Sequence, residues 1–143
     1  LQQAPTLTIA DTDLVQKLNE MDLTRTALAK IAQTNAARSD IATLGATMVK
    51  DLTGNQDRLS KLVSAHAITL PPKPSAANQK IIDRMQHLHG AAFDRAYMRY
   101  LSHDDARMKP VLESGITSSK NADLTKLATD TQTLLAAYEA QLK

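Results

Sequence analysis

The sequence predicts an all-α protein, folded as an antiparallel four-helix bundle. Its 143 residues are rich in Ala and Leu, which favour helices, and only four Gly and five Pro are available for turns. That number of Gly and Pro is too small for the turns of a many-stranded β-sandwich, β-branched apolar residues are few, and aromatic residues make up 3% of the chain. Apolar residues recur at spacings of three, four and seven, the period of one buried helix face.

The chain is expected to divide into a short arm and one domain. Residues 1–10 contain Pro5 and follow no helical period, so they predict a flexible N-terminal arm. Residues 11–143 predict a single helical domain, long enough to bury one core. The polar, Pro-containing start at Leu1, without an initiator Met, is expected of a mature chain after signal-peptide removal; a shortened recombinant chain is the alternative.

The first half of the domain predicts two long helices separated by a short turn. Asp11 or Thr12 is a suitable N-cap for a first helix that ends near Asn35. Ser39 or Asp40 is a suitable N-cap for the second helix. Both helices are therefore expected to begin at capping side chains of their own.

Proline and glycine mark the second half of the domain. Residues 69–75 contain three prolines, which exclude helix and predict a stiff crossover between the second and third helices. The third helix is expected to begin near Ala76, with an interruption at Gly90 and a kink at Pro110. Residues 114–121 predict a turn before the last helix.

Composition excludes several classes of function. The 17 Lys and Arg nearly balance the 15 Asp and Glu, and no basic run occurs, so we expect no nucleic-acid partner. The apolar stretches are too short for a transmembrane segment. The absence of Cys excludes thiol catalysis, iron–sulfur clusters, thiolate zinc sites and disulfides, and is compatible with export.

Neither a di-iron centre nor a hydrolase is indicated. A di-iron bundle needs Glu-x-x-His on two helices, and none of Glu20, Glu113 and Glu139 has a His three residues later. No G-x-S-x-G motif is present to position a nucleophile. Asp104 and Asp105 diverge by about 100° on a helix, so they are not expected to converge on one substrate atom. We therefore expect no enzymatic activity and no cofactor.

Four residues form a candidate metal site. Met85 and His89 are four residues apart and share a helix face, and such soft and borderline ligands suit copper. His87 and His103 are the further candidate ligands, although His87 and His89 point about 200° apart on an intact helix. The alternative is that the histidines are solvent-exposed polar residues.

Arg25 is anomalous because it falls in the apolar stripe between Met21 and Leu28. A buried arginine needs a partner, since an isolated buried charge is strongly destabilising. The residue type therefore indicates either an internal ion pair or a pocket that holds an anionic ligand.

Residues 90–98 resemble a family signature. Gly90, Phe93, Asp94 and Tyr97 fit the G-x-x-F-D-x-x-Y pattern of the domain of unknown function 4142 family, and the Pro-rich crossover fits as well. The resemblance covers about residues 12–142. It implies a ferritin-like four-helix bundle exported to the bacterial periplasm, in a family whose members are often described as outer-membrane proteins.

The same resemblance suggests what this chain has lost. Relatives place Glu at the position of Arg25 and His at those of Leu52, Asp105 and, approximately, Tyr138. A metal held by that set would be lost here, because Leu52 cannot ligate. We interpret Arg25 as paired with Asp105, with Tyr138 donating a hydrogen bond to the pair.

The function expected from the sequence is that of an exported, non-enzymatic helical bundle that acts by binding or by association with the cell envelope. One alternative is a periplasmic protein that handles copper or iron through His and Met residues. Another is a carrier of a small apolar or anionic ligand in the bundle core. The partner would be an unidentified protein or envelope component, and the Ala-rich helix faces leave a homodimer open.

Overall fold

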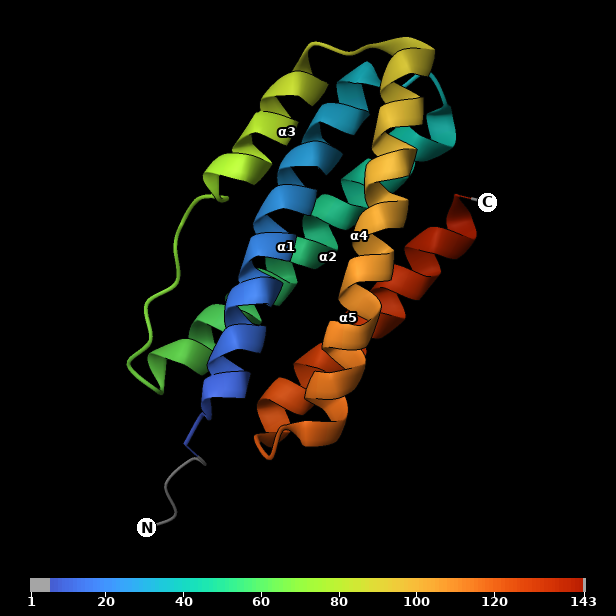
Figure 1. Cartoon of the computed structure of the whole chain (residues 1–143). Coiled ribbons are helices and arrows are strands. Elements are labelled where there is room, and N and C mark those ends of the chain that lie inside the picture. The colour runs from blue at the N-terminus through green and yellow to red at the C-terminus, as the bar shows by residue number, and fades with distance from the viewer. Residues whose placement is uncertain (1–5, 143) are drawn as a thin grey trace.

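The structure is a computed structural model that describes residues 6–142, and its regular secondary structure there is α-helical, as predicted. Five helices follow one another within these residues, where the sequence predicted four (Figure 1). They are α1 (Ile9–Asn35), α2 (Ser39–Ser64), α3 (Ala76–Gln86), α4 (Gly90–Ser118) and α5 (Ala122–Gln141).

The four long helices enclose the core. The helix α1 packs against α2 and α4, and α5 packs against α4 and α2. In the view of Figure 1, α1 and α5 run upward while α2 and α4 run downward, so each long helix is antiparallel to the two it contacts. The short α3 lies on the outside of α1 and also contacts α4. The core is largely aliphatic, with Met21, Met48 and Met108 among its fully buried side chains, as the apolar stripes predicted.

The helix α1 begins earlier than predicted. Thr8, not Asp11 or Thr12, is its N-cap, and the Thr8 side chain and Asp11 form a reciprocal capping box. Ile9 and Ala10 are therefore helical rather than part of an arm, and residues 1–5 of the predicted arm lie outside the described residues. The predicted start is three residues too late because Asp11, a residue type suited to the N-cap, here occupies the first turn of the helix.

The start of α2 is stabilised from elsewhere in the chain. Its N-cap residue, Arg38, makes no side-chain capping bond, and Ser39 and Asp40 already lie within the helix. The backbone N–H groups of Ala37 and Arg38 instead donate to the two carboxylate oxygens of Asp94 on α4, at 3.0 and 3.1 Å. A cap supplied by a distant helix leaves no local sequence signal.

The second half differs from the prediction at two places. The interruption at Gly90 is a full break, so the predicted third helix is two helices, α3 and α4. The turn predicted at residues 114–121 is mostly helix, because α4 runs past Pro110 to Ser118. Gly115 was read as a turn residue, but a Cβ at this position would collide with Leu14, so the glycine allows α1 and α4 to pack closely.

The predicted proline-rich crossover connects α2 to α3 and is tied to α1. The side-chain amide of Asn19 donates to the carbonyl of Pro71 at 3.0 Å, and the Glu20 carboxylate accepts from the backbone N–H of Ser75 at 2.9 Å.

None of the helices in residues 6–142 is long and apolar enough to cross a membrane.

Candidate functional site

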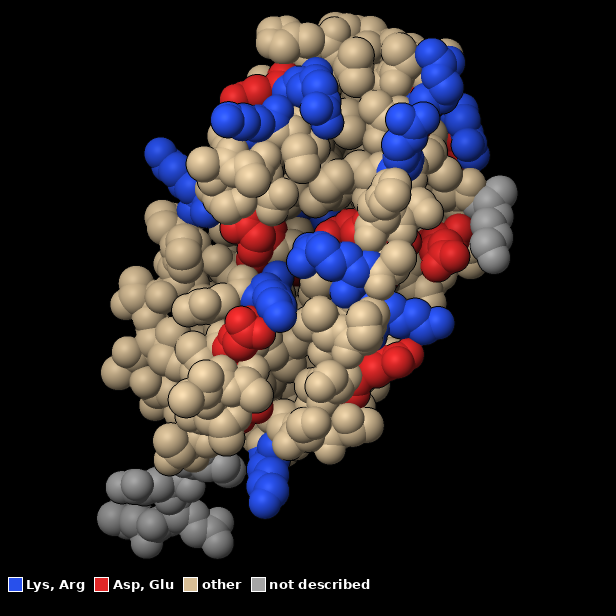
Figure 2. Space-filling model, in the orientation of Figure 1, with Lys and Arg blue, Asp and Glu red and all other residues tan. Residues whose placement is uncertain are grey.

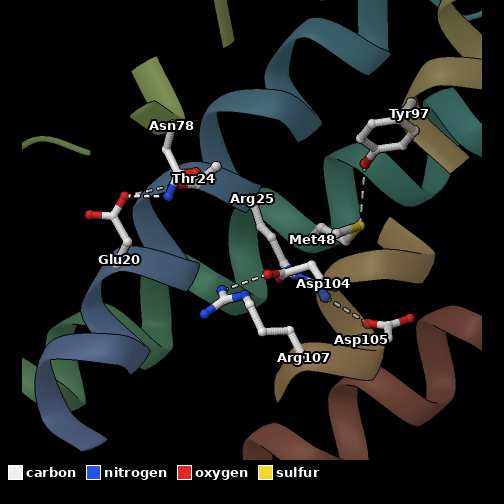
Figure 3. A network of polar contacts seen from close by, with 9 residues as sticks. All are labelled: Glu20, Thr24, Arg25, Met48, Asn78, Tyr97, Asp104, Asp105 and Arg107. Carbon is white, nitrogen blue, oxygen red and sulfur yellow. Dashed lines mark hydrogen bonds and ion pairs between the residues drawn. The ribbon is translucent and has the colours of Figure 1, made fainter. Parts of the chain in front are cut away.

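A buried arginine lies at the interface of α1 and α4. Only 1% of the Arg25 side chain is exposed. Its Nε donates to Oδ2 of Asp104 at 2.7 Å, and its Nη2 donates to Oδ1 of Asp105 at 2.6 Å (Figure 3). The contact with Asp105 is the one expected from the sequence. The contact with Asp104 was not expected.

Adjacent carboxylates on α4 reach the same guanidinium because that group is wide. Asp104 and Asp105 diverge on the helix, as predicted, but each contacts a different nitrogen of Arg25. The second oxygen of Asp104 accepts from Nη2 of Arg107 at 2.6 Å, so Asp104 lies between two arginines. We call Arg25, Asp104, Asp105 and Arg107 the Arg25 cluster; its two positive charges balance its two negative charges. The spacing of Asp104 and Arg107, three residues apart on a helix, is the sequence signal that would have revealed this part.

The pKa values around the Arg25 cluster reflect burial opposed by charge. Burial by itself would lower the pKa of Arg25, but Asp104 and Asp105 outweigh it and raise the pKa above its ordinary value. Burial raises the pKa of Asp105, and Arg25 partly opposes this effect. These directions describe an arginine that stays charged beside a half-buried carboxylate.

One further carboxyl group lies in the core near Arg25. Asp22 is 2% exposed, and burial raises its pKa well above the ordinary value, with Arg25 acting in the opposite direction. Its Oδ1 has no hydrogen-bond partner within residues 6–142. Burial without a hydrogen-bond partner destabilises the ionised form of a carboxyl group relative to its protonated form.

The Tyr138 hydroxyl has a different hydrogen-bond partner from the one that the sequence suggested. It donates to Oδ2 of Asp51 on α2 at 2.8 Å, and not to the pair formed by Arg25 and Asp105. Burial is the main cause that raises the pKa of Tyr138, followed by its hydrogen bond to Asp51. The predicted hydrogen bond from Tyr138 to the Arg25–Asp105 pair is wrong, because α2 brings a competing acceptor, Asp51, beside the Tyr138 hydroxyl.

A cleft of about 440 Å³ opens beside the Arg25 cluster, between α4 and α5. We call it the Arg25 cleft. Polar and apolar side chains share its lining: Arg25, Ser102, Asp105, Lys109, Tyr138 and Glu139 are polar, and Met98, Leu101, Ala106 and Leu142 are apolar. Arg25 and Tyr138 therefore face the same space without bonding to one another.

The signature residues perform structural roles at the start of α4. Gly90 has φ of +63°, a left-handed conformation that glycine adopts without strain, and it begins the helix. Asp94 caps the start of α2 from the side, as described above. The rings of Phe93 and Tyr97 stack with centroids 5.2 Å apart. The Tyr97 hydroxyl contacts Sδ of Met48 at 3.6 Å, as Figure 3 shows. Burial raises the pKa of Tyr97 to about 12.

The four candidate metal ligands do not share one environment. Met85 is buried in the core, whereas His87, His89 and His103 are exposed. His87 is the C-cap of α3, and His89 is the N-cap of α4. Because α3 ends before His89, Met85 and His89 do not share a helix face as predicted. Within residues 6–142, no group of three or more His, Cys, Asp or Glu is arranged to hold a metal ion.

The fold and the Arg25 cluster thus define an all-helical protein whose interior is crossed by an ion-pair network. The chain belongs to the family described as Domain of unknown function (DUF4142), whose model matches residues 1–143. This match confirms the family resemblance carried by residues 90–98. Comparison with curated proteins and with solved structures gives no match.

Proposed function

We propose that this protein is an exported, non-enzymatic binding protein, built as an antiparallel, ferritin-like four-helix bundle of α1, α2, α4 and α5. The antiparallel contacts among these helices support the bundle, and the α2–α3 crossover supplies its long connection. A non-enzymatic role is supported by Asp104, whose two oxygens are both engaged by arginines and are not available as a general base.

We propose that the Arg25 cleft is the binding site. The observation that carries this proposal is a fully buried cation beside an open cleft with apolar walls. Asp104 and Asp105 occupy Nε and Nη2 of Arg25, and Nη1 has no hydrogen-bond partner within residues 6–142. The expected ligand has an apolar body and one acceptor group, such as a carboxylate, because apolar walls with a few polar groups are typical of small-molecule sites.

Filling the cleft tests this proposal. Ala106 lines the cleft and takes no part in the ion pairs, so Ala106→Trp should fill it without breaking them. Glu113→Trp places the same side chain on an exposed part of α4 outside the cleft and is the matched control. With the fluorescent fatty acid cis-parinaric acid as the probe, we expect saturable binding to the wild type and the control, weakened at least about tenfold in Ala106→Trp.

Two outcomes would contradict the cleft as the binding site. One is the absence of saturable binding to the wild type, and the other is an equal loss of binding in both Trp variants. Native mass spectrometry of the same protein with copper distinguishes the metal-handling alternative, which predicts one retained ion per chain. The spread of Met85 and the histidines over different environments does not favour that alternative.

Export and association with the envelope are supported by membership of the family, whose resemblance implied them, and the cysteine-free sequence is compatible with export. Osmotic-shock fractionation of bacteria that express the complete gene tests this part. We expect the protein in the periplasmic fraction, and retention with the cytoplasmic markers would contradict export.

A further inference from the structure

A second cleft lies where the C-terminal end of α2 meets the N-terminal end of α5, both at the lower end of the molecule in Figure 1. Its volume is about 410 Å³. Basic residues from α2, from the turn before α5 and from α5 itself line it: Arg58, Lys61, His66, Lys120 and Lys126. We call it the basic cleft.

The basic cleft carries a surplus of positive charge. Arg58 and Lys126 share a single carboxylate oxygen, Oδ2 of Asp130, at 2.9 and 3.3 Å. Lys61 and Lys120 make no ion pair within residues 6–142. Within residues 6–142, Asp123 lines the basic cleft and Asp130 pairs with two of its cations, so the four lysines and arginines with these two acids carry a formal charge of +2.

This surplus contrasts with the rest of the molecule. The whole chain has the same formal net charge of +2, so the residues outside the basic cleft balance to zero. On the face shown in Figure 2, acidic and basic side chains lie next to one another across the middle of the molecule. Like charges repel one another, so the uncompensated cations that line the basic cleft destabilise its empty state. They favour the binding of an anion there.

The size and the lining of the basic cleft restrict the anion. Leu62, Ala65 and Leu127 supply apolar wall between the charged groups, so the space is a hollow rather than a flat charged surface. A phosphate monoester carries a charge of about −1.5 to −2 at pH 7, which matches the surplus. Lysine ammonium groups bind phosphate as point charges, and the planar arginine fork of Arg58 adds paired donors.

We propose that the basic cleft binds a phosphate monoester, with Lys61 and Lys120 as its main contacts. The site is at a different place from the Arg25 cleft and does not depend on the ligand proposed there. The group can belong to a soluble phosphorylated molecule or to a lipid headgroup at a membrane surface.

The test compares two double variants that each remove two positive charges. Lys61→Gln with Lys120→Gln changes the basic cleft, and Lys73→Gln with Lys80→Gln changes exposed lysines that line no described cleft. Titration calorimetry with glycerol 3-phosphate measures the soluble arm. Cosedimentation with phosphatidylcholine vesicles, with or without phosphatidic acid, measures the membrane arm.

We expect the wild type to bind at least one of these phosphate monoesters with unit stoichiometry, and the Lys61/Lys120 variant to lose at least about tenfold in affinity. The Lys73/Lys80 variant should bind as the wild type does. Binding to glycerol 3-phosphate identifies a soluble ligand as sufficient, and binding only to phosphatidic acid vesicles identifies a headgroup. The proposal is overturned by no binding in either arm, or by equal losses in the two double variants, which would indicate non-specific attraction.

Discussion

Carboxylates attach α4 to the rest of the molecule at two places, in its first turns and in its middle turns. The two places differ in the kind of group that the carboxylates bind. Asp94 accepts from two backbone N–H groups at the turn between α1 and α2. Asp104 and Asp105 accept from the charged side chain of Arg25 on α1. The first attachment replaces a missing helix cap, and the second balances a charge in the core.

The difference determines how each region tolerates change. Every residue except proline supplies a backbone N–H at the turn, so the attachment at Asp94 depends on one side chain alone. The Arg25 cluster depends most on Arg25, because removing this buried cation leaves Asp104 and the half-buried Asp105 without their shared partner. We therefore expect a substitution of Arg25 to reduce the free energy of unfolding more than one at Asp94. We also expect a second substitution that neutralises the opposite charge to recover part of the loss.

The largest loss is expected for Arg25→Ala. Among the described residues 6–142, Asp105 would lose its sole ion-pair partner and Asp104 one of two, at a cost of about 3–5 kcal/mol in the free energy of unfolding. Arg25→Met should lose less, because its side chain still fills the space. Urea unfolding measures both variants, and adding Asp104→Asn and Asp105→Asn to Arg25→Met should recover stability. If the two Asn substitutions recover no stability in the Arg25→Met background, the role given to the buried charge is contradicted.

A smaller loss is expected for Asp94→Ala. Two backbone N–H groups at the start of α2 would lose their acceptor, at a cost of about 2–3 kcal/mol. Thermal unfolding measures the loss, and Asp83→Ala on the exposed face of α3 is the control, for which we expect little change. If Asp94→Ala were as stable as this control, the cap would have no energetic importance.

The variant Gly90→Ala should have a free energy of unfolding about 1–2 kcal/mol lower than that of the wild type. The cost is that of the left-handed backbone alone, since a Cβ at this position would meet no atom within 4 Å. Gly90→Asn tests this reason by chemical denaturation, because Asn tolerates the left-handed conformation better than Ala. A Gly90→Asn variant less stable than Gly90→Ala would indicate a steric cause instead.

Tyr138→Phe should lose about 1 kcal/mol, the net value of its hydrogen bond to Asp51. The ring and its packing are retained in this variant, so the measured difference isolates the hydroxyl group. Urea unfolding with the double variant Tyr138→Phe/Asp51→Asn completes the cycle. Strictly additive losses would show that Tyr138 and Asp51 do not interact.

Asp22→Asn is the one change expected to increase stability at neutral pH. The pKa of Asp22 is raised by burial, so the folded state binds its proton more tightly than the unfolded state does. The stability that this adds is complete below the unfolded pKa and is lost as the pH rises through the folded pKa. The advantage of Asp22→Asn over the wild type should therefore grow above about pH 4 in unfolding experiments. A pH-independent difference would show that Asp22 does not titrate as proposed.

Much of the fold follows from the sequence because its signals are local. The apolar stripes predict which helix faces are buried, and three prolines predict the crossover, since both act within a few residues of the chain. The family signature at Gly90, Phe93, Asp94 and Tyr97 is readable for the same reason. Even the anomaly of Arg25 in an apolar stripe is visible, because a charged residue breaks the local pattern.

Tertiary structure decided what depends on residues far apart in the chain. The cap of α2 comes from Asp94, more than fifty residues away, and the helical Gly115 is explained only by its contact with Leu14. Tyr138 bonds to Asp51 rather than to the Arg25 pair because α2 places a second acceptor beside it. A one-dimensional pattern gives the face on which a residue lies, but the choice between competing partners depends on distances that exist only after the helices have packed.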